Sequence, residues 1–112
     1  MTIALIVLLM VFQETAELGK ASYYSDKLVG KPMAGGGVYQ KEAFTAAHRT
    51  LPFGTRVRVT HLATESTVEV VITDRGPFIK GRIIDLSRAA AEQLGIIIQG
   101  VAQVKVEVLK EE

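Results

Sequence analysis

The 112-residue sequence contains no cysteine, no tryptophan and only two histidines. Without cysteine the chain has no disulfide framework, no thiolate zinc site, no thiol nucleophile and no N-terminal cysteine to carry a lipid. With His48 and His61 as the only imidazoles, a histidine-rich metal site is not expected. No cluster of residues calls for a metal or an organic cofactor, and we therefore predict none.

Neither sign of charge is in excess, since thirteen Lys and Arg stand against twelve Asp and Glu, for a net charge of +1. This balance does not favour a nucleic-acid binder, which usually shows a basic patch. The hydrophobic share of 48% and the charged share of 22% exclude a disordered tail and a coiled coil. The length is that of one domain, which buries roughly two-thirds of its unfolded surface and so has a real core.

Long hydrophobic runs are also lacking. The longest, residues 3–12, is too short for a membrane-spanning helix, which takes about 20 residues, and we expect no stable membrane span. The run fits the apolar core of a secretory signal peptide. However, no basic residue precedes Lys20, and Glu14 lies where a small residue is preferred before the best cleavage position, Ala16. Residues 1–19 are thus predicted to be a signal peptide or, alternatively, an N-terminal apolar strand or helix.

The rest of the chain, residues 20–112, is predicted to form the folded domain from short β-like runs separated by Gly and Pro. Residues 41–48 are ambiguous between a helical turn and a strand, and the three glycines of residues 35–37 indicate a loop that can approach another group closely. A helix is expected over residues 88–94. Its N-cap would be Ser87 or Asp85, and Gly95 would end it. Strands are expected at residues 20–25, 56–60, 67–73, 82–84 and 103–108. Six or so strands without an internal repeat predict a mainly β fold, a small barrel with one or two short helices.

Asp74 is the first candidate for chemistry. The alternation of Val68, Val70 and Ile72 places its carboxylate along the apolar face at the end of a strand, and the following Gly-Pro fixes the turn. A carboxyl group that is partly desolvated in this way retains its proton nearer neutral pH, which suits a general acid. The alternative is structural: Asp74 caps the turn or pairs with an arginine.

His48 is the second candidate, because it lies between small residues and a turn, where a neutral imidazole could bind a carboxyl group or a substrate hydroxyl. A lone histidine is nevertheless more often a satisfied structural residue. Several aromatic rings could stack on sugars or, equally, belong to the core. These rings are those of Tyr23, Tyr24, Tyr39 and Phe78. Asp85 is interpreted as part of the helix cap.

Four motifs occur in a fixed order, at residues 21–24, 45–55, 74–78 and 82–91. Together they resemble the rare lipoprotein A (RlpA) family of bacterial lytic transglycosylases over residues 20–109. The resemblance implies a six-stranded double-psi β-barrel, the fold also seen in expansins and barwin-like proteins. It also implies peptidoglycan as the ligand, in particular glycan strands stripped of their stem peptides.

The resemblance also assigns roles to single residues. Asp74 matches the family's essential acid, and His48 matches its Ala-Ala-His histidine, expected to orient Asp74 or to support the oxocarbenium ion. The residues expected to bind substrate are Tyr23, Tyr24, Thr45, Arg75 and Phe78. The family's further loop acid is replaced here by Gly37.

The expected function is an endolytic peptidoglycan lytic transglycosylase that cleaves the MurNAc-GlcNAc β-1,4 bond and leaves 1,6-anhydroMurNAc ends. Because Gly37 supplies no carboxylate, a non-catalytic glycan-binding barrel is the main alternative, and a protein-interaction or inhibitor domain is a weaker one. The expected location is the cell envelope, periplasmic or secreted, without a lipid anchor because there is no cysteine. Cell-division or envelope proteins are candidate partners.

Overall fold

The computed structural model describes residues 16–110, so the signal peptide predicted for residues 1–19 falls largely outside the described residues. Six strands and two short helical segments make up the described part. These are β1 (Ala16–Tyr23), η1 (Asp26–Leu28), β2 (Thr45–His48), β3 (Arg56–His61), β4 (Thr67–Asp74), β5 (Arg82–Leu86), α2 (Arg88–Leu94) and β6 (Ala102–Val108).

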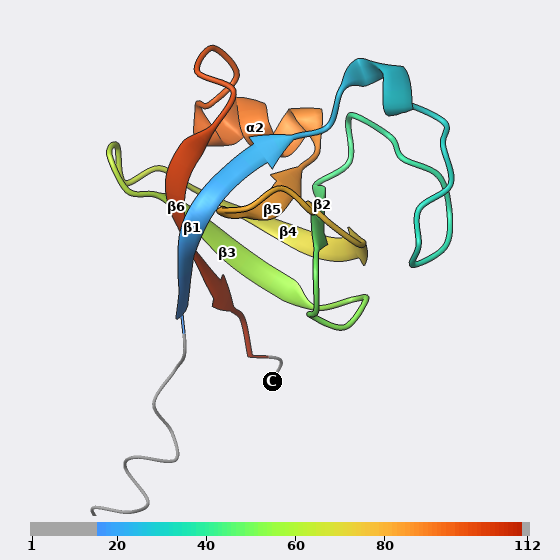
Figure 1. Ribbon diagram of the computed structural model, residues 1–112, viewed down its shortest axis with the longest axis horizontal. Helices are drawn as coiled ribbons and strands as arrows, with labels where there is room; N and C mark the ends of the chain where they lie inside the picture. The colour runs from blue at the N-terminus through green and yellow to red at the C-terminus, as the bar shows by residue number, and fades with distance from the viewer. Residues whose placement is uncertain (1–15, 111–112) are drawn as a thin grey trace, which may run out of the picture.

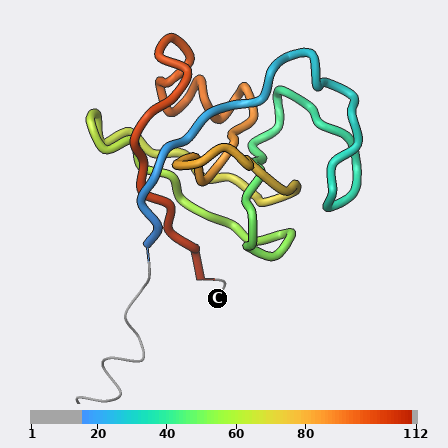
Figure 2. The backbone as a smooth tube through the Cα atoms, in the orientation of Figure 1, coloured from blue at the N-terminus to red at the C-terminus, as the bar shows by residue number. Residues whose placement is uncertain are grey.

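The strands close into a barrel in the order β1-β5-β2-β4-β3-β6. Figure 1 labels the six strands, and Figure 2 traces the backbone through them. The pairs β1–β5 and β2–β4 are parallel, and the other four pairs are antiparallel. Closure gives every strand two neighbours in the sheet. The predicted mainly β, six-stranded barrel is confirmed.

The first strand begins earlier than the sequence indicated. Residues 16–19, which we assigned to the N-terminal segment, pair with β6 from Ala16 opposite Glu107 to Gly19 opposite Val104. Most side chains at the start of β1 are exposed, and Leu18 is exposed as well. This stretch therefore has no apolar alternation from which a strand could be predicted.

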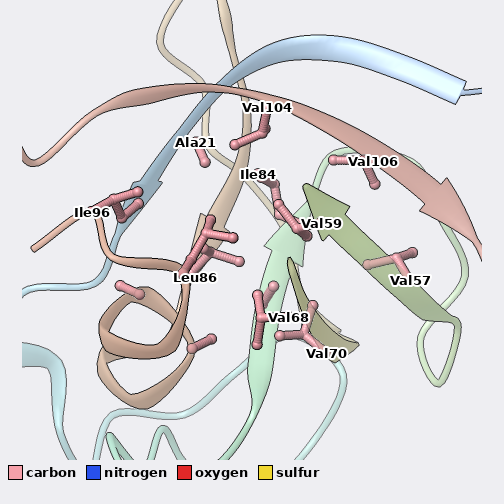
Figure 3. Packing of buried hydrophobic residues seen from close by; sticks show 14 of the residues in the cluster. Ala21, Val57, Val59, Val68, Val70, Ile84, Leu86, Ile96, Val104 and Val106 are labelled. Atoms are coloured by element: carbon pink, nitrogen blue, oxygen red, sulfur yellow. The ribbon is translucent and has the colours of Figure 1, made fainter. Parts of the chain in front are cut away.

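Valine, isoleucine and leucine side chains from the strands fill the barrel interior, as Figure 3 shows. Alternating residues of β3, β4 and β6 point inwards, among them Val57, Val70 and Val104, but Val108, at the end of the predicted alternation in β6, is 44% exposed. The helix α2 packs on the same core through Ala90, Ala91 and Leu94.

Helix α2 has the ends that the sequence predicts. The Ser87 side chain accepts a hydrogen bond from the backbone N–H of Ala90, and Gly95 adopts a left-handed conformation with φ 81°. The cap is therefore Ser87 and not Asp85, which leaves the Asp85 carboxylate free for other contacts. In the part of the chain from residue 16 to 110, no helix has the length and apolar character needed to cross a membrane.

Candidate active site

Asp74 ends β4, but it does not lie on the face that the alternation predicted. Ile72 pairs with Ala46, whereas Asp74 pairs with Ala47, so Thr73 is an extra residue in the parallel ladder between β2 and β4. Ala46 belongs to the barrel core, and Ala47 to a second cluster with Tyr24 and Tyr39. A one-residue shift exchanges the two faces of a strand. The carboxylate of Asp74 therefore lies on the outer face of the barrel, and the expected position on the apolar face is wrong.

Three hydrogen-bond donors hold the Asp74 carboxylate. The hydroxyl of Tyr24 donates to Oδ2 at 2.5 Å, and the backbone N–H groups of Ala34 and Arg75 donate to Oδ1 at 2.8 and 2.9 Å. Asp74 remains partly exposed. The carboxylate is thus fixed in orientation and can still be reached from solvent, as a group that acts on a polymer must be.

Tyr24 is a permanent donor in this arrangement. Its ring stacks on that of Tyr39, with 4.5 Å between the ring centroids. Burial, followed by the hydrogen bond to Asp74 and its charge, raises the pKa of the Tyr24 hydroxyl far above its ordinary value. The phenol therefore stays protonated at neutral pH. Because its ring is covered by Tyr39, Tyr24 serves to orient Asp74 and does not offer a free face to a sugar.

A second carboxyl group, that of Asp85, lies on the same face as Asp74, across the intervening strand β2. Ala47 of β2 is paired with Asp74 on β4 and with Asp85 on β5, so the three residues share one face. The Ser22 hydroxyl donates to Asp85 Oδ1 at 3.0 Å. Burial raises the pKa of Asp85, opposed by the Ser22 hydrogen bond and Arg82, while the charge of Asp74 raises it further. Our sequence analysis treated Asp85 as a cap and missed this proximity.

A signal for Asp85 was present in the sequence, since Ile84 and Leu86 on either side both face the core. Alternation places the residue between them on the outer face. The sequence could not show that β2 lies between β4 and β5, and that order is what brings Asp85 next to Asp74.

His48 is not brought together with Asp74. Its ring lies on the opposite face of β2 from Ala47, because His48 pairs with the core residue Ile84. Nε2 donates to Glu17 Oε1 at 2.7 Å, and Nδ1 accepts from the backbone N–H groups of Thr50 and Leu51 at 3.2 and 3.1 Å. The expected direct contact between the imidazole and Asp74 is therefore wrong. Adjacent residues of a strand point to opposite sides, so the position of Ala47 excludes it.

Arg75 is held by the turn that follows β2. Its guanidinium donates to the carbonyl oxygens of His48 and Leu51 at 3.1 and 2.8 Å and lies 3.9 Å from the centroid of the Phe53 ring. Arg75 therefore does not form an ion pair with Asp74, to which it contributes its backbone N–H instead.

The segment after Asp74 presents an exposed ring. Phe78 is 80% exposed, the kind of apolar face on which a sugar can stack. Arg49 fixes this segment by donating to the carbonyl oxygens of Pro77, Ile79 and Arg82. The exposed ring therefore stands on a backbone that is held in place.

The loop of residues 33–37 docks on the end of β4. Besides the Ala34 N–H on Asp74, the N–H of Gly35 donates to Thr73 O at 2.9 Å. A Cβ on Gly35 would lie only 2.6 Å from that oxygen, so only glycine permits this approach. Gly37, where the family's acid is replaced, belongs to the same loop and has φ +74°, and a Cβ there would meet only Met33 Cε, at 4.0 Å.

The remaining predicted residues are divided between the two faces. The Tyr23 hydroxyl donates to Ile97 O at 2.8 Å and its ring packs on the core, away from Asp74. Thr45 lies two residues before Ala47 and therefore on the same face as Asp74. Within residues 16–110, no three carboxylate or imidazole groups gather as metal ligands would.

The closed barrel with two parallel strand pairs is a double-psi β-barrel, as its likeness to solved structures shows. The Streptomyces papain inhibitor superposes with a TM-score of 0.68 at 24% identity, over 86% of this chain and 96% of that one. An expansin of Clavibacter michiganensis superposes with a TM-score of 0.68 at 21% identity, over 88% of this chain and 52% of the expansin. At these identities the likeness shows the fold alone.

The sequence profile described as "Lytic transglycolase" matches residues 16–106, and the chain belongs to that family. The endolytic peptidoglycan transglycosylase RlpA of Pasteurella multocida is 51% identical over 92 residues, which are 82% of this chain and 31% of that protein. The probable RlpA of a Nostoc species is 56% identical over 93 residues, 81% of this chain and 25% of the relative. The chain thus spans only about a quarter to a third of these relatives. The predicted resemblance to the RlpA family is confirmed.

Proposed function

We propose that this barrel is an endolytic lytic transglycosylase that cleaves the MurNAc-GlcNAc β-1,4 bond of stem-peptide-free peptidoglycan strands. The relatives named above carry the name of this activity. The observation on which the proposal depends is the Asp74 carboxylate, which is fixed by three donors, remains partly exposed, and is followed four residues later by the exposed ring of Phe78.

The proposed reaction needs one acid-base group. Protonated Asp74 gives its proton to the glycosidic oxygen as the bond from that oxygen to the anomeric carbon of MurNAc breaks. The C6 hydroxyl of the same MurNAc attacks the anomeric carbon, a 1,6-anhydro ring closes, and the Asp74 carboxylate takes the hydroxyl proton. The nucleophile is intramolecular, so proximity lessens the need for a second activating group. Asp74 ends the cycle protonated, and no water is consumed.

The other residues on this face then serve to bind or position substrate. Phe78 supplies a stacking surface for a sugar ring, and Thr45 lies on the same face of β2 as Ala47. Tyr24 and the backbone of Arg75 hold the carboxylate in place. Tyr23 is not part of this binding surface, because its hydroxyl and ring are engaged on the core side.

A glycan-binding module without catalysis is the second candidate, and Gly37 is the observation that favours it. The loop carrying Gly37 docks against the end of β4 but brings no second carboxylate to Asp74. Its backbone has φ +74°, a conformation in which a side chain costs roughly 1 kcal/mol, although the surrounding space would admit one.

The two candidates are separated by products. Purified glycan strands without stem peptides are incubated with the protein, and the released ends are identified by mass spectrometry. The enzyme proposal predicts 1,6-anhydroMurNAc ends, and their loss by about 10²–10⁴-fold in Asp74→Asn, the usual share of general acid-base catalysis. Asp26→Asn is the matched control, because Asp26 is an exposed aspartate in η1 and should leave the rate unchanged.

Undiminished product from a folded Asp74→Asn variant would contradict the role of Asp74. Glycan binding by the wild type without any anhydro ends would instead identify a binding module. In that case Gly37→Glu, which restores the family's loop acid, should produce cleavage where the wild type has none.

We further propose a location in the cell envelope, where glycan strands are found, as the names of the relatives indicate. Cell-division or envelope proteins remain proposed partners, to be sought by crosslinking in cells.

A further inference from the structure

We propose that Glu17, His48 and Arg75 form a positioning chain that holds Asp74 from the opposite face of β2. In this chain His48 acts as a hydrogen-bond acceptor that closes a turn, and it moves no proton in the reaction. The inference depends on the proposed function, since it concerns how the proposed acid is kept in place.

His48 has no free atom with which to do chemistry at Asp74. Its side chain is only 6% exposed, and it lies on the core side of β2. Nδ1 faces two backbone N–H groups and must therefore carry the lone pair, which leaves the ring proton on Nε2, where Glu17 accepts it. Both nitrogens are thus used within the protein.

The two bonds accepted by Nδ1 close the turn that follows β2. They satisfy the N–H groups of Thr50 and Leu51, which would otherwise lack these partners. The same turn presents the carbonyl oxygens of His48 and Leu51 to the guanidinium of Arg75. The imidazole of His48 and the guanidinium of Arg75 therefore bind backbone groups of the same short turn.

Arg75 connects this turn to the hydrogen-bond donors of Asp74 in two ways. Its own backbone N–H is one of the three donors on the carboxylate. Its guanidinium lies over the ring of Phe53. The same ring packs closely against Gly35, since a Cβ added at Gly35 would lie 2.9 Å from it. Gly35 follows Ala34, which supplies another donor to Asp74. Two of the three donors thus depend on the turn that His48 closes.

Glu17 completes the chain at the barrel end. It lies on β1, which is separated from β2 by β5, so its bond to Nε2 joins two strands that do not pair. This bond also fixes the tautomer that leaves Nδ1 free to accept.

The test compares two substitutions of His48. In His48→Asn the amide Oδ1 can take the place of Nδ1 and accept from the turn, but the side chain cannot transfer a proton. His48→Leu has no acceptor. With the product assay above, we expect kcat of His48→Asn to stay within about tenfold of the wild type and kcat of His48→Leu to fall by about 10²-fold with little change in KM.

His61→Leu is the matched control for loss of stability alone. His61 is as buried as His48, at 5% exposure each, and its Nδ1 also bonds within a local turn, to Thr64 Oγ1 at 3.0 Å. It has no connection to Arg75. We expect His61→Leu to lower the unfolding midpoint but to leave kcat per folded molecule unchanged. A loss of kcat in His61→Leu equal to that in His48→Leu would overturn the proposal.

Arg75→Met supplies a second arm. The carbonyl oxygens of His48 and Leu51 both accept from Nη1 of Arg75, and methionine has no N–H group to donate to either of them. If the chain exists, His48→Leu and Arg75→Met are non-additive in kcat, the double variant being no slower than the worse single one. Full additivity of the two effects on kcat would overturn the proposal. An equal loss of kcat in His48→Asn and His48→Leu would also overturn it, and would indicate proton transfer by the imidazole.

A spectroscopic readout separates this proposal from the proposed function. The carboxyl carbon resonance of Asp74 should shift in His48→Leu, and stay near its wild-type position in His48→Asn and His61→Leu. If the wild type is inactive, the proposed function is wrong, but the Asp74 resonance still tests the positioning chain of Glu17, His48 and Arg75. An unchanged resonance in His48→Leu would defeat the chain even if the wild type is active.

Discussion

At the scale of the residue, the site consists of two carboxyl groups on one face of the barrel with unlike surroundings. Asp74 receives three hydrogen bonds, whereas Asp85 receives one from Ser22, and burial raises the pKa of Asp85. The two acids therefore differ in hydrogen bonding, although they lie on one face of the barrel.

Asp85→Asn should change stability in a pH-dependent way. Burial raises the pKa of Asp85, so the folded state binds more protons than the unfolded state between the ordinary and the raised value. Wild-type stability therefore falls as the pH rises through that window. The amide can still accept from Ser22 but carries no charge, so the variant should be more stable than the wild type at neutral pH and lose this advantage in acid.

Urea unfolding at neutral pH and at a pH below the ordinary aspartate pKa measures this difference. A stability difference that does not change with pH would contradict the account of Asp85. Activity is recorded in parallel, since Asp85 lies beside Asp74 across Ala47.

At the scale of the element, local patterns predicted where β3, β4, β6 and α2 lie but not how their ends are turned. Alternation gave the inward residues of β4 correctly up to Ile72. The extra residue Thr73 then exchanged the faces, because the register shift depends on β2, a partner the local sequence does not reveal. The same limit explains the error on His48. The side of β2 on which its ring lies follows from the pairing with β5, and the sequence of residues 41–48 does not reveal that pairing.

Gly35→Ala tests whether the loop of residues 33–37 positions the acid. Its Cβ would lie 2.6 Å from Thr73 O and 2.9 Å from the Phe53 ring. Forcing an atom into such contacts costs about 1–3 kcal/mol and should move the loop that carries the Ala34 donor. We expect a lower unfolding midpoint together with a clear loss of kcat.

Gly36→Ala is the control for this substitution. Its φ of +102° is unfavourable for alanine, but the space around it is open. The substitution therefore strains the backbone without a steric clash against β4. Activity per folded molecule should be retained. Equal losses of kcat in the two variants would show that the loop's fit against β4 does not matter.

At the scale of the whole molecule, barrel closure assembles the site from segments far apart in the sequence. Tyr24 follows β1, Ala34 lies in the β1–β2 connection, and Asp74 and Asp85 lie in β4 and β5. The number of short strands predicted a small barrel, and the family resemblance supplied the double-psi topology that short strands alone leave open. The neighbours of each side chain required the closed structure.

Ile84→Ala tests the dependence of the site on the core. Ile84 is fully buried at the centre of the barrel, where Figure 3 shows it among side chains from other strands. Truncating such a residue typically lowers the free energy of unfolding by 2–5 kcal/mol. Ile98→Ala, at a fully exposed position, should change it by less than about 0.5 kcal/mol. Chemical denaturation followed by circular dichroism measures both, and equal effects would contradict the assignment of the core.

The claim that this protein cleaves glycan by internal attack is tested most directly by running the reaction in water enriched in heavy oxygen. Mass spectrometry of the new MurNAc ends should show anhydro products, each lighter by one water than a hydrolysed end and free of the heavy isotope. These products should disappear in Asp74→Asn. Heavy oxygen at the cleaved ends would show that water is the nucleophile and would contradict the account.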